Sequence, residues 1–160
     1  MRKASFAAMP CSLAQALDVV GEWWTLLIVR DAFFGVTRFE DFARRLGIAR
    51  NVLAARLDKL VDEGVLERVP YDEARARFDY HLTPKGRGLL PVLTALRQWG
   101  DEWVTGPGNE PIAFEHEGCG GRVRASVVCG DCGAPVDART TRVRPGPGAP
   151  ADGGLVPVGR

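Results

Sequence analysis

Residues 37–64 read TRFEDFARRLGIARNVLAARLDKLVDEG and hold two amphipathic segments separated by Gly47. Apolar side chains recur at helical spacing on both sides of this glycine, which predicts a short helix before it and a second helix over about 49–63. Thr37 and Glu40 form a capping-box pattern that favours a helix start there. Two short helices joined by a glycine-containing turn are typical of a helix-turn-helix, although many small helical proteins also contain such a pair.

The segment that follows strengthens this interpretation. Apolar and polar residues alternate over 65–69 and again over 78–82, and a polar, charged connection over 70–76 separates them. Alternation with a period of two predicts strands, so these residues form a predicted hairpin. A hairpin placed directly after the second helix is the wing of a winged helix.

Two helices are predicted before the helix-turn-helix. Ser12 and Gln15 form another capping-box pattern, and the helix that they begin ends at Gly21. The next segment, 22–34, is apolar nearly all round. This pattern predicts a helix at the centre of the core, and we interpret the Trp and Phe side chains as core residues.

A long last helix is predicted after the wing. Thr83 serves as its N-cap with Pro84 at its first position, and an apolar stripe runs along it as far as Trp103. Trp99 and Trp103 lie late in this helix, where they are placed to pack across a dimer interface. The sequence Gly-Pro-Gly at 106–108 then indicates a domain boundary.

Composition and the positions of glycine and proline residues indicate the domain organisation. The chain of 160 residues is 46% hydrophobic with a formal net charge of +1, so any nucleic-acid surface has to be a local patch. We predict a mainly α protein with a small β-wing: a winged helix-turn-helix DNA-binding and dimerisation domain over 1–108, a zinc-ribbon-like β module over 109–139, and a disordered Pro/Gly-rich tail over 140–160. We find no secretory signal and no run of about 18 apolar residues, which predicts a cytoplasmic protein without membrane contact.

Basic residues collect on the predicted helix-turn-helix. Between Thr37 and Lys59 there are six basic and three acidic residues, a local excess that the total charge hides. We interpret the second helix as the recognition helix, because its face opposite Leu57 mixes small, amide and basic groups that suit base edges in the major groove. The predicted DNA-binding residues, with phosphate contacts from the first helix and the wing, are Arg38, Arg50, Asn51, Val52, Ala55, Arg56, Lys59, Arg75 and Arg77.

Several segments together resemble HxlR-type regulators, a MarR-like family of bacterial transcription regulators. They include 16–21 (ALDVVG), 24–28 (WTLLI), 53–57 (LAARL) and 80–86 (YHLTPKG), and the similarity covers roughly residues 11–103. The resemblance implies a winged-helix homodimer that is joined through its first and last helices. It also implies binding to double-stranded DNA at a pseudo-palindromic operator, and we interpret the protein as a repressor.

The resemblance also singles out Cys11. Some members of the family sense oxidants or electrophiles through a cysteine near the N-terminus, and Cys11 occupies such a position. A thiol at a helix N-terminus is placed to favour the thiolate. Cys11 is therefore a redox-sensing candidate for an oxidant or small-molecule effector. The alternative is a small buried residue beside the dimer helices.

The other three cysteines belong to two pairs of potential metal ligands. His116 and Cys119 form one pair, Cys129 and Cys132 form the other, and each pair encloses two residues and precedes a glycine. Together they give a set of three thiolates and one imidazole that suits a structural Zn²⁺ ion. The alternatives are a redox pair of Cys129 and Cys132 or a vestigial site without metal, whereas four protein ligands leave no open position for catalysis.

Two other classes of function compete with DNA binding. One is a protein-interaction module in which a degenerate winged helix no longer binds DNA. The other is a thiol oxidoreductase that uses Cys129 and Cys132, but no thioredoxin-like βαβ pattern surrounds them. We find no nucleophile–base pair, phosphate loop or paired carboxylates elsewhere, so the sequence does not predict an enzyme.

Overall fold

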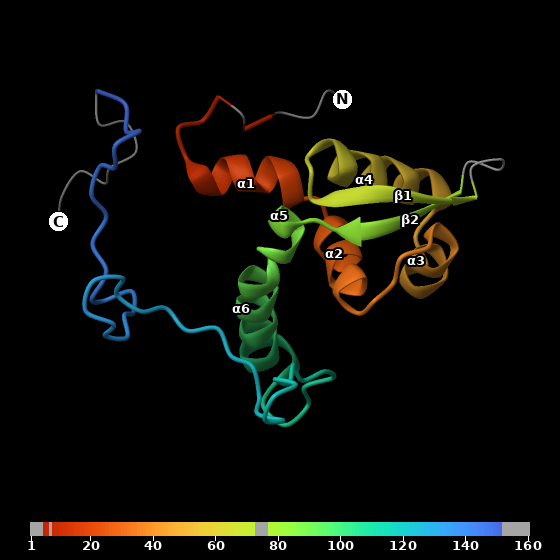
Figure 1. The fold of residues 1–160 in the computed structure, drawn as a ribbon. Coiled ribbons are helices and arrows are strands. Elements are labelled where there is room, and N and C mark those ends of the chain that lie inside the picture. The colour runs from red at the N-terminus through yellow and green to blue at the C-terminus, as the bar shows by residue number, and fades with distance from the viewer. Residues whose placement is uncertain (1–4, 7, 73–76, 152–160) are drawn as a thin grey trace. The chain divides into compact units, whose positions relative to one another are not determined.

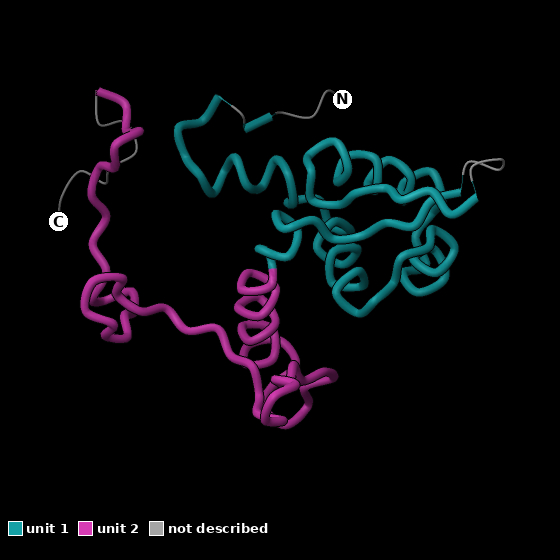
Figure 2. The backbone as a smooth tube through the Cα atoms, in the orientation of Figure 1, with its two compact units in different colours: residues 1–89 teal, residues 90–160 magenta. Residues whose placement is uncertain are grey.

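The computed structural model describes residues 5–6, 8–72 and 77–151, and the chain divides into two compact units, 1–89 and 90–160 (Figures 1 and 2). Unit 1 contains α1 (Ser12–Val20), α2 (Thr25–Phe33), α3 (Phe39–Leu46), α4 (Arg50–Asp62), β1 (Leu66–Asp72), β2 (Arg77–Leu82) and α5 (Pro84–Arg87). The predicted helices of the helix-turn-helix and the two strands of the wing are confirmed within a few residues. Arg75, a predicted DNA contact, lies outside the described residues.

Helix α2 lies in the core, as its apolar character predicts. Ile28 and Val29 are completely buried in it, and α2 packs against α3, α4 and β2. The prediction that the Trp and Phe side chains of this segment are core residues is wrong for Trp23, which is 91% exposed, and for Phe34, which is 40% exposed. The chain turns over 21–24 and α2 begins only at Thr25, so Trp23 precedes the part of the segment that the core surrounds.

A buried carboxylate helps to fix α3 against α2. Asp31 on α2 is fully buried and accepts hydrogen bonds from Nε of Arg30 at 2.9 Å and from Nε of Arg45, on α3, at 3.4 Å. Buried charges are retained in proteins when such partners compensate them. The arginine at the end of α3 therefore has a structural role.

Two of the predicted helix caps are wrong. The N-cap of α1 is Cys11 rather than Ser12, and the Gln15 amide donates to the Met9 carbonyl at 3.1 Å. The N-cap of α3 is Arg38, because the Thr37 hydroxyl donates instead to Asp79 at 3.0 Å. In both cases the side chain that would form the capping box is hydrogen-bonded instead to a residue outside the helix.

The wing is tied to the helix-turn-helix through its second strand. β1 and β2 pair antiparallel with Leu66 opposite Leu82, and β1 continues beyond its predicted end to Asp72. The Tyr80 N–H donates to the Thr37 carbonyl at 2.8 Å, which attaches β2 to the segment before α3. α4 lies beside β1 (Figure 1). The positions of the wing and of both helices are thus mutually fixed.

The predicted long last helix is two helices. Thr83 is the N-cap of α5, and its hydroxyl accepts a hydrogen bond from the Gly86 N–H at 3.1 Å, which confirms the cap. α5 ends at Arg87, and Gly88 is its C-cap. Glycine is among the least favourable residues in a helix interior. Unit 2 then begins with α6 (Leu90–Gly100), which a π-helical turn, η2 (Asp101–Thr105), continues.

The rest of unit 2 is a C-terminal extension, residues 106–151, without a regular helix or strand among the elements assigned there. The division between the units falls after Leu89, earlier than the predicted boundary at 108, because side chains of α6 hydrogen-bond the extension. Of the predicted disordered tail over 140–160, the part from 152 onward lies outside the described residues.

Within the described ranges, no single helix combines the length and the apolar character that a membrane span requires. α1 and α2 meet that requirement only when taken together, as a pair bent by 75°.

Candidate nucleic-acid interface

Helix α4 buries one face and exposes the opposite one. Leu53, Leu57 and Leu60 are completely buried. The exposed stripe on the other side consists of Asn51, Ala55, Asp58 and Asp62. Its N-terminal half is uncharged and its C-terminal half is acidic, a difference that the predicted set of contacts does not include. Only the N-terminal half of α4 therefore suits contact with DNA bases.

Arg50 is held at the N-terminus of α4. Its Nη1 and Nη2 atoms each lie 2.6 Å from an oxygen of Glu40, and its guanidinium lies over the Phe39 ring at 4.9 Å. The hydrogen bonds from Arg50 lower the pKa of Glu40, and the same hydrogen bonds raise the pKa of Arg50. Arg50 thus remains charged in a fixed orientation, with 65% of its side chain exposed.

Two further arginines from separate elements act on Glu40 through their charge, and one of them, Arg44, forms its own ion pair with Asp41. The positive charges of Arg77, at the start of β2, and of Arg44, on α3, also lower the pKa of Glu40. The charges of Arg44, Arg50 and Arg77 therefore all act on one carboxylate. We call these three arginines and Glu40 the Glu40 cluster. Sequence reasoning missed Arg44 as a member, although Arg44 lies four positions after Glu40 on α3, a spacing that places two side chains on the same side of a helix.

Arg38 lies at the junction of α3 and the wing. Its side chain is 59% exposed, its Nε lies 3.7 Å from Oδ1 of Asp79, and its guanidinium lies over the Tyr71 ring at 4.8 Å. The backbone bridge between Arg38 and Asp79 fixes this position. The arrangement presents the guanidinium at the surface between the helix-turn-helix and the wing, where a phosphate contact is predicted.

The other predicted α4 contacts are less available than the helical wheel suggests. Nη2 of Arg56 donates to Glu22 at 3.0 Å, and only 26% of the Arg56 side chain is exposed. Lys59 pairs with Glu63 at 3.2 Å, and Val52 is half-buried. Arg56 and Lys59 therefore lie on the flanks of the exposed stripe and are held by carboxylates.

Cys11 is a half-buried free thiol at the N-cap of α1. The predicted position at a helix N-terminus is confirmed. Its Sγ atom has no disulfide partner among the described cysteines.

The two pairs of predicted metal ligands are each formed locally. Nδ1 of His116 lies 3.4 Å from Sγ of Cys119. In the other pair, hydrogen bonds from the backbone of Cys132 and Asp131 lower the pKa of the Cys129 thiol. Within the part of the chain that the structure describes, no three His, Cys, Asp or Glu side chains are grouped closely enough to hold a metal ion. The zinc site remains a prediction.

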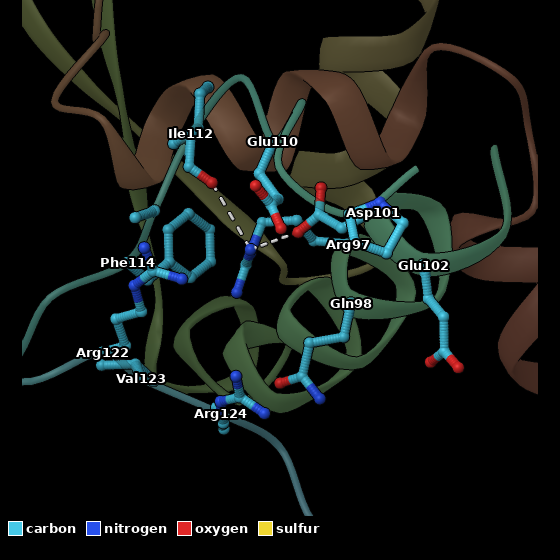
Figure 3. Close-up of a pocket in the computed structure, with 12 residues that line it drawn as sticks. Arg97, Gln98, Asp101, Glu102, Glu110, Ile112, Phe114, Arg122, Val123 and Arg124 are labelled. Atoms are coloured by element: carbon cyan, nitrogen blue, oxygen red, sulfur yellow. Dashed lines mark hydrogen bonds and ion pairs between the residues drawn. The ribbon is translucent and has the colours of Figure 1, made fainter. Parts of the chain in front are cut away.

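Unit 2 also contains a cavity of about 280 Å³ between α6 and the extension (Figure 3). Arg97 crosses this cavity: it donates to Asp101 at 2.5 Å and to the Ile112 carbonyl at 3.4 Å, and its guanidinium lies over the Phe114 ring at 5.0 Å. Pockets that bind small molecules usually have about 300–1,000 Å³ and a mostly apolar lining. The size and the ion pair indicate that the cavity belongs to the packing of the extension on α6.

This fold and this basic surface define a winged helix-turn-helix transcription regulator. The chain belongs to the HxlR-like helix-turn-helix family, whose model matches residues 19–107. It is 46% identical over 137 residues to the uncharacterized HTH-type transcriptional regulator Rv3095 of Mycobacterium tuberculosis. The aligned region covers 86% of this chain and 87% of the relative.

Solved structures are similar over two different lengths. The crystal structure of PA1607, a candidate transcription factor, matches with a TM-score of 0.78 and 44% identity over 88% of this chain and 99% of that chain. The redox regulator HypR in its oxidized form matches with a TM-score of 0.52 and 30% identity over 56% of this chain and 94% of its own. The similarities to Rv3095 and PA1607 are too long to end at residue 107, so they include part of the extension.

Proposed function

We propose that the protein binds double-stranded DNA as a homodimer and represses transcription from a pseudo-palindromic operator. In this proposal the N-terminal half of α4 enters the major groove, and Asn51 and Ala55 contact base edges. An asparagine side chain can pair with adenine through two hydrogen bonds, and an alanine methyl can contact the methyl group of thymine.

The observation that carries this proposal is the charge distribution around α4. Exposed uncharged side chains at its N-terminal end adjoin the Glu40 cluster, and the acidic residues of the stripe lie near the other end. Arginines beside a surface of small and amide side chains suit phosphates on either side of the bases being read. Recognition helices generally contact base edges with their N-terminal residues.

Exposed apolar side chains support a second copy of this chain as the partner. On α1, Leu13 is 70% exposed; on α6, Trp99 is 57% exposed, and Trp103 in the following turn is 68% exposed. Large apolar side chains that gather on helix surfaces mark interaction sites. We propose that the two copies pair through α1 and α6, which would cover these side chains. A two-fold pair supplies the two copies of α4 that a two-fold operator requires.

Selection from a library of random duplexes tests this function. The protein is purified under reducing conditions without chelator, and the bound DNA is sequenced. We expect a two-fold motif whose half-sites lie about one helical turn, roughly 10 base pairs, apart. Failure to enrich any sequence would contradict the proposal and would favour a protein-interaction module with a degenerate winged helix.

Arg38 is expected to contribute to affinity without reading sequence. The variant Arg38→Ala should weaken binding to all duplexes by a similar factor and should reduce the slope of log K against log salt concentration by about 1. Arg124→Ala, which removes an exposed arginine of the extension, is the matched control and should leave the slope unchanged. Weakening by Arg38→Ala on one sequence alone would contradict a phosphate contact.

We further propose that Cys11 is the residue through which an oxidant changes DNA binding. The similarity to a redox regulator and the position of the thiol at the start of a helix support this proposal. Mild peroxide treatment is expected to alter the operator affinity of the unmodified chain and to leave that of Cys11→Ser unchanged. An equal response of both proteins would assign oxidation to another residue.

A further inference from the structure

The extension contains the same small hairpin twice, thirteen positions apart. In the first copy, residues 114–123, the His116 N–H donates to the Gly121 carbonyl at 2.9 Å and the Gly120 N–H donates to the His116 carbonyl at 2.8 Å. In the second copy, residues 127–136, the equivalent bonds are Cys129 N–H to Ala134 carbonyl at 2.8 Å and Gly133 N–H to Cys129 carbonyl at 2.9 Å.

The outer ends of the two hairpins also correspond. The Val123 N–H donates to the Phe114 carbonyl at 2.7 Å, and the Val136 N–H donates to the Val127 carbonyl at 3.1 Å. A glycine with a positive φ closes the turn in each copy, with φ of 68° at Gly120 and 71° at Gly133. Only residues without a Cβ adopt this conformation readily, so the glycine after each ligand pair is required by the turn.

Each hairpin carries a ligand pair at its tip and has no core of its own. Among the described residues after Thr94 no side chain is buried, and the large side chains of the second hairpin, Val127 and Val128, are 71% and 53% exposed. An isolated two-stranded hairpin is at best marginally stable in water. Modules this small usually obtain their stability from a bound metal, disulfides or a partner.

We infer that the two hairpins close on one Zn²⁺ ion held by His116, Cys119, Cys129 and Cys132. Three thiolates and an imidazole match the ligands of structural zinc, and four protein ligands complete a tetrahedral shell. Each hairpin already has its turn, but the two ligand pairs are not grouped among the described residues, so the ion would bring the two hairpins together.

The connection between the hairpins is fastened to α6. The Gln98 side chain bonds both backbone groups of Ala125: its Nε2 donates to the Ala125 carbonyl at 3.0 Å, and the Ala125 N–H donates to its Oε1 at 2.5 Å. A metal that closes the hairpins on each other would therefore form a single module attached to α6, the helix that we assign to the dimer interface. This inference does not depend on DNA binding.

Zinc content per chain tests the site directly. The full chain, expressed in zinc-supplemented medium and desalted, is expected to hold one Zn²⁺ per chain, and its Co²⁺ form to show the absorption bands of tetrahedral thiolate coordination. Cys119→Ser and Cys132→Ser should each abolish stoichiometric binding, whereas His116→Cys should retain it through four thiolates. Cys11→Ser is the matched control and should bind one ion.

Titration of the unmodified chain with an organomercurial avoids any loss of folding in the variants. Zinc should be released in step with the modification of three thiols, and the fourth thiol, Cys11, should titrate separately. Absence of zinc, half an ion per chain, release that follows only two thiols, or full retention of metal by Cys119→Ser or Cys132→Ser would overturn a single site built from both hairpins.

Discussion

Replacement of Phe42 by alanine is expected to lower the free energy of unfolding of unit 1 by about 3–5 kcal/mol. Phe42 is completely buried on α3, which packs against α2 and α4, so its removal leaves a cavity beneath the helix-turn-helix. Small domains are stabilised by only about 5–15 kcal/mol in total, so the loss should be evident in the midpoint of urea denaturation followed by circular dichroism.

Phe34→Ala is the matched control for this prediction. Phe34 is 40% exposed, and the same change of side chain should cost less than about 1.5 kcal/mol there. Similar destabilisation by both variants would show that Phe42 does not have the central position in the core that the structure gives it.

Asn51→Ala is expected to weaken binding to the selected operator by about 1–3 kcal/mol and to relax the preference at one base pair in each half-site. The side chain lies on the exposed N-terminal half of α4 and contributes nothing to the buried face, so folding should be unaffected. The measurement is fluorescence anisotropy with the operator, with its single-base variants and with a random duplex.

Asp62→Ala provides the control on the same exposed face. Asp62 lies at the C-terminal end of α4, and removal of its negative charge should not weaken operator binding. If Asn51→Ala reduced affinity for the operator and for the random duplex equally, Asn51 would not read a base and the assignment of α4 would need revision.

The helix-turn-helix and the wing could be predicted from sequence because their signals are local. Leu53, Leu57 and Leu60 repeat at helical spacing, and all three are buried as that spacing requires. The second strand of the wing follows from the alternation over 78–82, and the two strands pair in the structure. The first strand does not alternate in its burial, because Leu66 is the only buried residue among the described residues of β1. Periodicity determines which face of an element is buried, so the orientation of α4 followed from the pattern.

The helix ends could not be predicted as reliably, because capping side chains have competing partners. Thr37 matches a capping box by its spacing, but its hydroxyl donates to Asp79, which lies 42 positions later in the chain. Thr83 has the same kind of side chain and does form its cap. The difference arises from tertiary contacts that a local pattern does not contain.

Most of the residues of the candidate interface could be predicted from sequence, but the ion pairs between them could not. Nothing in the spacing of Glu40 and Arg50 indicates that they pair, and the same holds for Glu22 and Arg56. These ion pairs decide which basic groups are free at the surface. Of the repeated hairpins of the extension, only the tips could be predicted, as two ligand pairs that each precede a glycine. The equivalence of the whole hairpins lies in backbone hydrogen bonds, which the sequence does not show.

Methylation interference on the selected operator tests the central claim most directly. Methylation of guanine N7 blocks contacts in the major groove, whereas methylation of adenine N3 blocks contacts in the minor groove. Because the proposal places one α4 helix in the major groove of each half-site, interference at guanine N7 is expected at two symmetry-related positions about one helical turn apart. Interference confined to adenine N3, or to a single half-site, would contradict a dimer that reads DNA through α4.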